Sequence, residues 1–291
     1  MKKFRILVLA VSAAVIAVFL FRAVRDRITC DSTAPVITAD EDYLEISVSA
    51  TEEDLLAGMQ ATDNLDGDVT DTLVVVSKTK FISDRTRRVN YAAFDRNNNV
   101  GAYSRTITYT DYRSPHFSIS QPMRFLNGET VDFLRSVRAD DCLDGDLTRQ
   151  IKITFGQLQP ISDTVSAQKL NLLVTNSAGD SADLELTATF EDYTTFNQPA
   201  PALSAYIIYV QKGERPDYRS YLQGIWSAGS VRSFSDMELD PSGDIRVLDS
   251  TVRYNSPGVY TATFQLLRVG DKAGKTQTEP GTATMIVVVE E

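Results

Sequence analysis

The stretch ATDNLDGDVT occupies residues 61–70, and a near-copy, ADDCLDGDLT, occupies residues 139–148. The likeness continues downstream, because residues 92–112 and 172–193 both run from an apolar segment through an Asn- and Gly-containing loop to a final Asp-Tyr pair. The offset changes from 78 to 81 positions between these landmarks, and the connecting loops of a repeat tolerate such small insertions. The chain is therefore predicted to be a tandem array of similar small domains.

A third copy is weaker. Residues 212–226 resemble the segment ahead of the second acidic loop, and residues 256–276 resemble the end of a repeat. No Asp-Gly-Asp triplet occurs in this part of the chain, where only Ser242-Gly243-Asp244 remains. The 291 residues have room for three such repeats after a short N-terminal segment.

Short segments that alternate apolar and polar residues fill each repeat. Examples are YLEISVSA, RVNYAAF and SRTITYTDY in the first repeat, and QIKITF, KLNLLVT and DLELTATFED in the second. About seven strands in roughly 80 residues are typical of an immunoglobulin-type β-sandwich. The predicted fold class is all-β, with tandem immunoglobulin-like β-sandwiches after one N-terminal transmembrane helix. The predicted segments are a cytoplasmic N-terminus (1–5), a transmembrane signal anchor (6–24), a juxtamembrane linker (25–33), repeat 1 (34–112), repeat 2 (113–193), a proline-containing linker (194–202) and a divergent repeat 3 (203–291).

Basic residues flank an uninterrupted apolar run at residues 6–21. A cleaved signal peptide normally places small residues after such a run, whereas arginine follows directly here, which favours an uncleaved signal anchor over a cleaved leader. Because nearly all of the chain follows the run, the β-domains are predicted to lie outside the cell. The predicted location is the cell membrane, single-pass, with the membrane contacted through the N-terminal helix and the C-terminal domains extracellular.

The charge balance of the chain limits the classes of partner that it is expected to bind. The net charge is −10, and six of the 29 basic side chains lie within residues 1–33, so the rest of the chain is more acidic than the average. An acidic surface argues against nucleic acid and favours metal cations or basic partners.

The chain has two cysteines, Cys30 and Cys142. Cys30 follows the apolar run and Cys142 lies inside the second acidic loop. Since the two positions are a whole domain apart, both are predicted to be free thiols.

The acidic loops resemble those of a known family. Repeats with the pattern D-x-x-D-G-D-hydrophobic-T, then D-x-x-G-N near the last hairpin, then a D-x-x-x-P linker, are similar to bacterial immunoglobulin-like repeats of surface proteins. They also resemble the related domains of pesticidal crystal proteins and hyalin-type repeats. The matching residues are Asp63, Asp66, Gly67, Asp68, Thr70, Asp95 and Asn99 in the first repeat, Asp141, Asp144, Gly145, Asp146, Thr148, Asn176, Gly179 and Asp180 in the second, and Asp271, Ala273 and Gly274 in the third, which has Lys275 where the family has Asn. The resemblance implies an architecture more than a function.

The acidic loops are candidate calcium sites. In an immunoglobulin topology the loop after the second strand and the loop between the last two strands lie at one pole, so their carboxylates converge. Calcium takes six to eight oxygen ligands, and carboxylates crowded without a cation repel one another. The predicted ligands are Asp63, Asp66, Asp68, Asp95 and Asn99 in repeat 1 and Asp141, Asp144, Asp146, Asn176 and Asp180 in repeat 2. The alternatives are that these residues only form turns, or that Arg113 or Arg138 supplies the counter-charge. Repeat 3 is predicted to be metal-free.

The sequence does not predict an enzyme. The sole histidine, His116, lies in a predicted first strand next to Pro115. No P-loop or G-x-G-x-x-G segment is present, and no pair of acids is singled out for glycoside hydrolysis.

The predicted function is that of a membrane-anchored extracellular repeat protein, a surface spacer or adhesion stalk stiffened by calcium. The alternative is a glycan- or cell-wall-binding module whose ligand surface lies on repeat 3. There Trp226, the sole tryptophan, is the candidate ligand contact, although alternating aromatic residues in strands also form cores. The ligand would be an extracellular glycan or protein.

Overall fold

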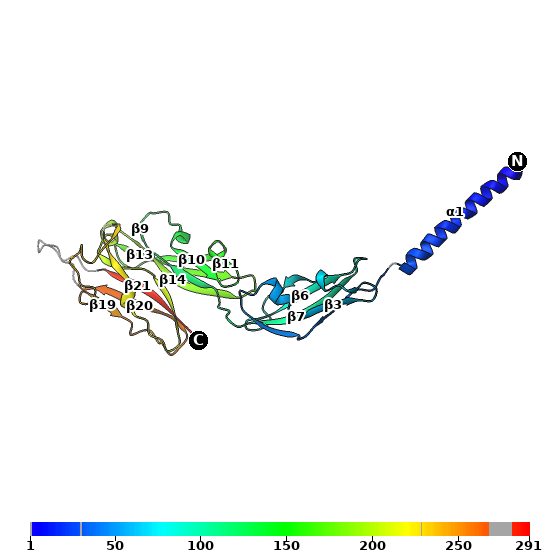
Figure 1. Ribbon diagram of the computed structural model, residues 1–291. Coiled ribbons are helices and arrows are strands. Elements are labelled where there is room, and N and C mark those ends of the chain that lie inside the picture. Colours follow the sequence, from blue (N-terminus) through cyan, green and yellow to red (C-terminus); the bar gives the residue numbers. More distant parts are fainter. Residues whose placement is uncertain (1, 30, 228, 268–280) are drawn as a thin grey trace. The chain divides into compact units, whose positions relative to one another are not determined.

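The computed structural model describes residues 2–29, 31–227, 229–267 and 281–291. The chain divides into two compact units, Met1–Tyr112 and Arg113–Glu291. After the N-terminal helix both units are built from β-sheets, which confirms the predicted β-sandwich fold class (Figure 1). The helices and 3-10 turns are α1 (Lys2–Thr29), α2 (Glu52–Leu56), α3 (Tyr193–Phe196), η1 (Thr70–Thr72), η2 (Phe133–Arg135), η3 (Thr148–Gln150) and η4 (Tyr218–Tyr221).

The first unit carries one sandwich, which we call sandwich 1. Its sheets have the strand orders β1-β3-β4 and β2-β7-β6-β5, and β2 pairs in parallel with the last strand, β7. Alternate residues of β3 are buried, as the apolar alternation of the sequence predicts. The strands are β1 (Val36–Ala39), β2 (Tyr43–Ile46), β3 (Met59–Asp63), β4 (Gly67–Asp68), β5 (Val74–Lys78), β6 (Thr86–Phe94) and β7 (Val100–Tyr109).

The second unit repeats this strand order twice. Sandwich 2 has the sheets β11-β10-β8 and β12-β13-β14-β9, and sandwich 3 has the sheets β15-β17-β18 and β16-β21-β20-β19. Sandwich 3 therefore has the topology of the other two although it lacks the Asp-Gly-Asp triplet. The strands of sandwich 2 are β8 (His116–Ile119), β9 (Arg124–Leu126), β10 (Val137–Asp141), β11 (Gly145–Asp146), β12 (Lys152–Pro160), β13 (Val165–Thr175) and β14 (Ser181–Glu191). Those of sandwich 3 are β15 (Ala200–Leu203), β16 (Ile207–Gln211), β17 (Leu222–Ser227), β18 (Ser230–Arg232), β19 (Ile245–Leu248), β20 (Gly258–Leu266) and β21 (Thr282–Glu290).

Large side chains close the core of sandwich 1. Leu55 and Tyr91 are fully buried, and the Tyr91 hydroxyl donates to the Leu55 carbonyl oxygen at 2.9 Å. Phe133, which the sequence aligns with Leu55, is buried in sandwich 2. Burying one such side chain contributes about 1.5–3 kcal/mol, so these positions anchor each repeat ahead of its acidic loop.

Sandwiches 2 and 3 share one continuous set of buried apolar residues. The Tyr206 backbone N–H donates to the Ile119 carbonyl oxygen at 2.8 Å, and the Tyr209 hydroxyl accepts from the Phe117 N–H at 2.8 Å. The His116 ring stacks on Tyr209 with 3.9 Å between ring centroids. Burial raises the pKa of Tyr209 to about 12, so its hydroxyl stays protonated at neutral pH. These contacts tie strand β8 to strand β16.

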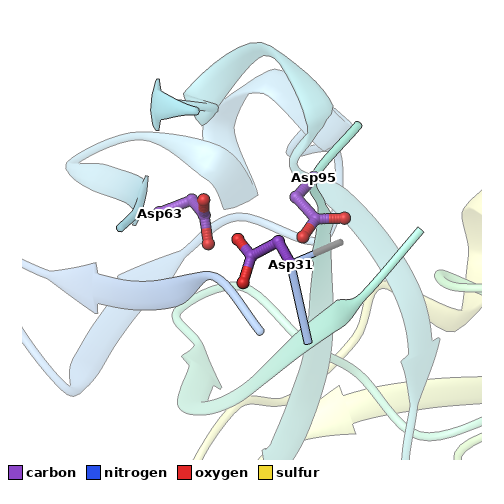
Figure 2. Close-up of side chains that lie close together, drawn as sticks. All are labelled: Asp31, Asp63 and Asp95. Atoms are coloured by element: carbon purple, nitrogen blue, oxygen red, sulfur yellow. The ribbon is translucent and has the colours of Figure 1, made fainter. Parts of the chain in front are cut away.

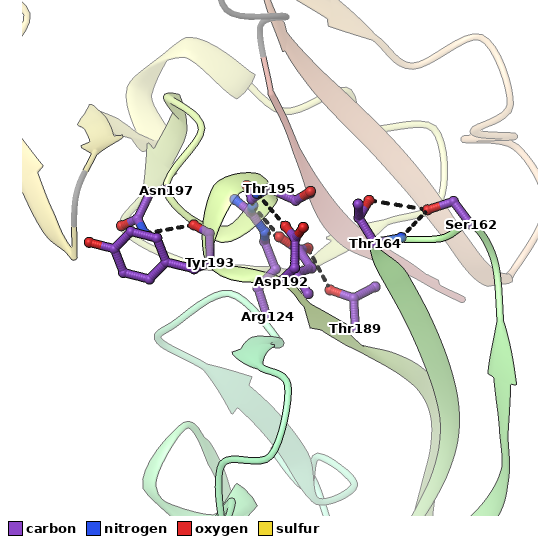
Figure 3. A network of polar contacts seen from close by, with 9 residues as sticks. Arg124, Ser162, Thr164, Thr189, Asp192, Tyr193, Thr195 and Asn197 are labelled. Atoms are coloured by element: carbon purple, nitrogen blue, oxygen red, sulfur yellow. Dashed lines mark hydrogen bonds and ion pairs between the residues drawn. The ribbon is translucent and has the colours of Figure 1, made fainter.

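The predicted linker at residues 194–202 is part of the folded unit. Its last residues form strand β15, which is fully buried and pairs with β17. Pro201 is compatible with a strand because β15 is an edge of its sheet, where a missing N–H is tolerated. Ahead of it, Arg124 donates to Glu191 at 2.9 and 2.5 Å and to the Thr195 carbonyl oxygen at 3.1 Å (Figure 3). Pro201 therefore belongs to an edge strand within the segment that was predicted to be a proline-containing linker.

The membrane span predicted at residues 6–24 is not found. Within the described residues, no helix combines the length and the apolar character that crossing a bilayer requires.

Candidate metal centre

The repeated acidic stretch forms a tight hairpin between β3 and β4. The Asp63 carboxylate accepts from the Leu65 N–H at 2.8 Å and from the Asp66 N–H at 2.9 Å. These bonds hold the pKa of Asp63 below its ordinary value because they stabilise the charged form, and the bond from Asp66 has the largest effect. Gly67 has a φ of +74°, which closes the hairpin without a Cβ clash. The carboxylate is thus ionised and held in one orientation.

The end of the motif locks the hairpin to the sandwich. The Asp68 carboxylate accepts from the Thr70 N–H at 3.0 Å, and the Thr70 hydroxyl oxygen accepts from the Ala61 N–H at 3.0 Å. In repeat 2, Asp146 accepts from the Thr148 N–H at 2.9 Å, and Thr148 accepts from the Ala139 N–H at 3.2 Å. The spacing of Asp, Gly, Asp and Thr is therefore explained by turn geometry in both repeats.

Besides the hairpin between β3 and β4, sandwich 1 has an acidic loop that joins β6 to β7. The Asp95 carboxylate accepts from the Asn99 N–H at 2.7 Å and from the Asn99 side-chain amide at 2.6 Å. Asn98 has a φ of +64°, a conformation that asparagine adopts more readily than most residues. These contacts fix Asp95 at the same pole of the sandwich as Asp63.

A third carboxylate comes from the segment ahead of β1. Asp31, Asp63 and Asp95 each offer an oxygen, and these atoms lie within 4.8 Å of one another (Figure 2). The Asp31 carbonyl oxygen accepts from the Asn99 amide at 3.1 Å, which holds the segment against the β6–β7 loop. We call these three side chains the carboxylate cluster.

The carboxylate cluster suits a hard cation. Asp63 and Asp95 are buried, with 8% and 7% of their surface exposed, so their charges are poorly screened by water. The Asn64 amide lies between two of them. With its nitrogen toward the cluster it donates to Asp63 at 3.1 Å and to Asp31 at 3.2 Å, and the opposite orientation presents a further oxygen ligand. Carboxylate and amide oxygens are the ligands that calcium takes in proteins.

The predicted ligands of repeat 1 divide into two groups. Asp63 and Asp95 lie in the carboxylate cluster, and Asn99 supports it as a hydrogen-bond donor. Asp66 instead accepts from the Arg96 N–H at 2.8 Å and lies 3.7 Å from the Arg96 guanidinium. Asp68 is engaged in its own turn. The structure thus brings two predicted ligands together and adds Asp31, which the sequence analysis had placed in a linker.

The matching pole of sandwich 2 has a different composition. The Asn176 amide donates to Asp141 at 3.1 Å, whereas the equivalent position in sandwich 1 is an aspartate. Asp144 accepts from the Ser177 hydroxyl at 2.7 Å, and Asp180 accepts from the Ser114 hydroxyl at 2.7 Å. In the described part of the chain, the carboxylate cluster is the one group of three candidate metal ligands. At this pole of sandwich 2 the neutral amide of Asn176 therefore stands where sandwich 1 has the charged carboxylate of Asp95.

The position equivalent to Asp31 has another role in the second copy. Asp111 precedes Pro115 by four residues, as Asp31 precedes Pro35. Its carboxylate accepts from the Ser47 hydroxyl at 2.7 Å and from the Val48 N–H at 2.8 Å, both within the first unit. Asp111 thus stabilises a turn of sandwich 1.

Cys142 replaces Asn64 in the second loop. It is a free thiol, half-buried, and its sulfur accepts from the Arg113 N–H at 3.4 Å and donates to the Arg113 carbonyl oxygen at 3.1 Å. Burial raises the pKa of the Cys142 thiol above its ordinary value, which favours the protonated form. Cys30 lies outside the described residues.

The remaining predicted positions lie in sandwich 3. Trp226 is half-buried on β17 and packs edge-to-face on Phe196 with 6.3 Å between ring centroids. Asp271, Ala273, Gly274 and Lys275, on which the metal-free prediction for repeat 3 rests, lie outside the described residues.

The turn carboxylates predict an acid dependence of stability. Hydrogen bonds from Thr70 and Thr148 hold the pKa of Asp68 and of Asp146 below its ordinary value in the folded state. A lowered folded pKa means that the stabilisation is present above pH 4 and is lost as pH falls through the folded pKa, because the unfolded chain binds the proton first. In urea unfolding followed by circular dichroism, the Asp68→Asn, Asp146→Asn double variant should lose less stability between pH 4 and pH 2 than the parent. Equal losses would contradict the assignment.

Comparison with known proteins defines no family for this chain. No protein-family model matches it, and no curated protein matches it. Similar solved structures include the CBM51-2 and INT domains of Clostridium perfringens ZmpB in complex with GlcNAc, at 17% identity over 54% of this chain and 41% of that chain, with a TM-score of 0.21. The lipoprotein BT2262 from Bacteroides thetaiotaomicron matches at 11% identity over 53% and 80%, with a TM-score of 0.20. Human protocadherin-24 EC1-2 matches at 10% identity over 55% and 99%, with a TM-score of 0.21. This chain spans less than half the length of the ZmpB chain in the first of these structures.

Proposed function

We propose that this chain is a non-enzymatic extracellular repeat protein, a surface spacer or adhesion stalk, in which a calcium ion binds the carboxylate cluster of sandwich 1. Three sandwiches of one strand order and the net charge of −10 support an acidic β-repeat protein of this kind. The observation that carries the proposal is the convergence of Asp31, Asp63 and Asp95 within 4.8 Å.

The origin of the three side chains explains how a cation would stiffen the protein. Asp63 is the last residue of β3, Asp95 follows β6, and Asp31 lies in the segment that leads into β1. An ion that takes one oxygen from each ties that segment to two loops of the sandwich. The proposed ion is calcium rather than magnesium, since calcium accepts irregular sets of six to eight oxygens while magnesium demands near-ideal octahedral geometry.

The engagement of His116 supports a non-enzymatic role. Its Nε2 atom lies 2.7 Å from the Glu290 carboxylate, and its ring is stacked on Tyr209. The sole histidine is thus engaged in the packing of sandwich 2 against sandwich 3.

Calorimetric titration of the full-length protein tests the proposal. We expect one calcium ion to bind per chain, and Asp95→Asn to abolish the heat, because the variant removes a buried charge from the cluster. Asp68→Asn carries the same charge change outside the cluster and should bind as the parent does. Absence of heat at millimolar calcium, or equal loss in both variants, would remove the assignment.

A further inference from the structure

A pocket of about 400 Å³ opens on sandwich 2 at the start of β12. This strand is an edge of its sheet, and the pairing of Lys152 with Leu173 of β13 puts both side chains on one face. The lining residues are Arg149, Gln150, Ile151, Lys152, Leu173 and Thr175. We call this site the Arg149 pocket.

Two positive charges line the Arg149 pocket. Arg149 and Lys152 are exposed, and neither takes part in the ion pairs found in the described ranges of the chain. The carboxylate of Asp146, two residues before η3, accepts from the Thr148 N–H and interacts with the charge of Arg149 without forming a close ion pair. In a chain of net charge −10, two exposed cations beside one pocket attract an anionic group locally.

Comparison with sandwich 1 indicates that the fold does not require these charges. Asp71 and Val74 stand at the positions equivalent to Arg149 and Lys152, in the same turn and first strand residue. Val74 pairs with Ala92 as Lys152 pairs with Leu173. The same topology is therefore built with one acidic and one apolar residue at these positions.

We propose that the Arg149 pocket binds a sugar-acid unit of an anionic polysaccharide. The planar guanidinium of Arg149 matches a carboxylate in a two-bonded fork, and Lys152 adds a second positive charge. Leu173, which is 41% exposed, offers an apolar surface to the C–H face of a sugar ring. Gln150 and Thr175 supply donors and acceptors for ring hydroxyls. The volume lies in the range of small-ligand pockets.

This binding site is separate from the carboxylate cluster, which lies in the other compact unit. Binding of the sugar acid therefore needs no calcium, and either assignment can fail without the other.

The test is a titration of the full-length protein with trigalacturonic acid, in the presence of a chelator, followed by calorimetry. The fully methyl-esterified trisaccharide, which has the same rings without the charges, should bind at least tenfold more weakly. Arg149→Asp and Lys152→Val, which install the residues of sandwich 1, should together lower the affinity at least tenfold. Raising the salt concentration should weaken binding as well, because the contact is between exposed charges.

Arg135→Asp is the matched control for Arg149→Asp. Arg135 lies in the same sandwich, is exposed, and is 3.7 Å from Asp132 outside the pocket. This variant should bind trigalacturonic acid as the parent does. The proposal is overturned if no binding occurs at millimolar ligand, if the methyl ester binds equally well, if Arg135→Asp loses as much affinity as Arg149→Asp, or if inorganic phosphate binds as tightly as the trisaccharide.

Discussion

Calcium at 100 times its dissociation constant is expected to raise the melting temperature of sandwich 1 in the full-length protein by roughly 10–20 °C, and Asp31→Asn is expected to remove most of that shift. A ligand at 100 times its dissociation constant stabilises the folded state by about 2.7 kcal/mol. For a domain of roughly 80 residues, each kcal/mol moves the transition by about 4–8 °C. Asp31 is the position to change because it supplies one of the three carboxylates and lies in the segment ahead of β1.

The variants separate cation binding from general effects of charge. Asp31→Asn and Asp68→Asn each remove one negative charge, but only Asp31 lies in the carboxylate cluster. Differential scanning fluorimetry with calcium, with magnesium and with a chelator gives the comparison. A calcium shift of equal size in both variants, or no shift in the parent, would contradict a calcium site at this pole.

Gly101→Ala is expected to destabilise sandwich 1 by about 1–3 kcal/mol and to weaken calcium binding. A Cβ atom at Gly101 would lie 2.1 Å from the Pro35 carbonyl oxygen, a backbone atom that cannot move without displacing the chain ahead of β1. That chain carries Asp31, so the substitution separates Asp31 from Asp95. Urea unfolding gives the loss of stability, and calorimetry gives the loss of affinity.

Gly243→Ala is the control for Gly101→Ala. A Cβ atom added at Gly243 would lie 3.5 Å from its nearest neighbour, the Asp240 carboxylate, which is an ordinary contact distance. The control should change neither stability beyond about 0.5 kcal/mol nor calcium affinity. A Gly101→Ala variant as stable as this control would show that the close approach of Pro35 is not needed.

The repeated motif predicted much of the fold because its spacing has a local physical cause. Asp63 and Asp68 accept from backbone N–H groups two or three residues away, and Gly67 adopts a positive φ between them, so the pattern alone indicates a hairpin. The convergence of Asp63 with Asp95 followed from the expected topology, in which the two loops share a pole. The hairpin could be inferred from contacts between residues close in sequence, and the convergence of Asp63 with Asp95 from the regular topology of the fold.

Asp31 could not be assigned in this way because its position depends on a tertiary contact. It lies in a segment without regular structure, and the approach of Pro35 to Gly101 and the bond from the Asn99 amide to its carbonyl oxygen hold it at the pole. A signal was present in the D-x-x-x-P pattern, which occurs at residues 31–35 and 111–115. That pattern does not tell the two roles apart, since Asp111 binds a turn of sandwich 1.

The apposition of sandwiches 2 and 3 was equally hidden in the sequence. Strand β15 is buried at all four positions, yet Pro201 within it and Pro199 just before it are also typical of an extended linker. Apolar alternation indicates which face of a strand is buried, but it does not name the partner. Only the contacts of Tyr206 and Tyr209 with β8 identify sandwich 2 as that partner.

The parallel pairing near the two ends of each sandwich governs how the protein would respond to tension. In sandwich 1, β2 pairs in parallel with the last four residues of β7, and β9 with β14 and β16 with β21 repeat the arrangement. A pull on the two ends of a sandwich slides such strands past one another, so their bonds are loaded in shear together and do not peel apart one at a time. A chain of these sandwiches resists extension through its backbone ladders, whatever its loops bind.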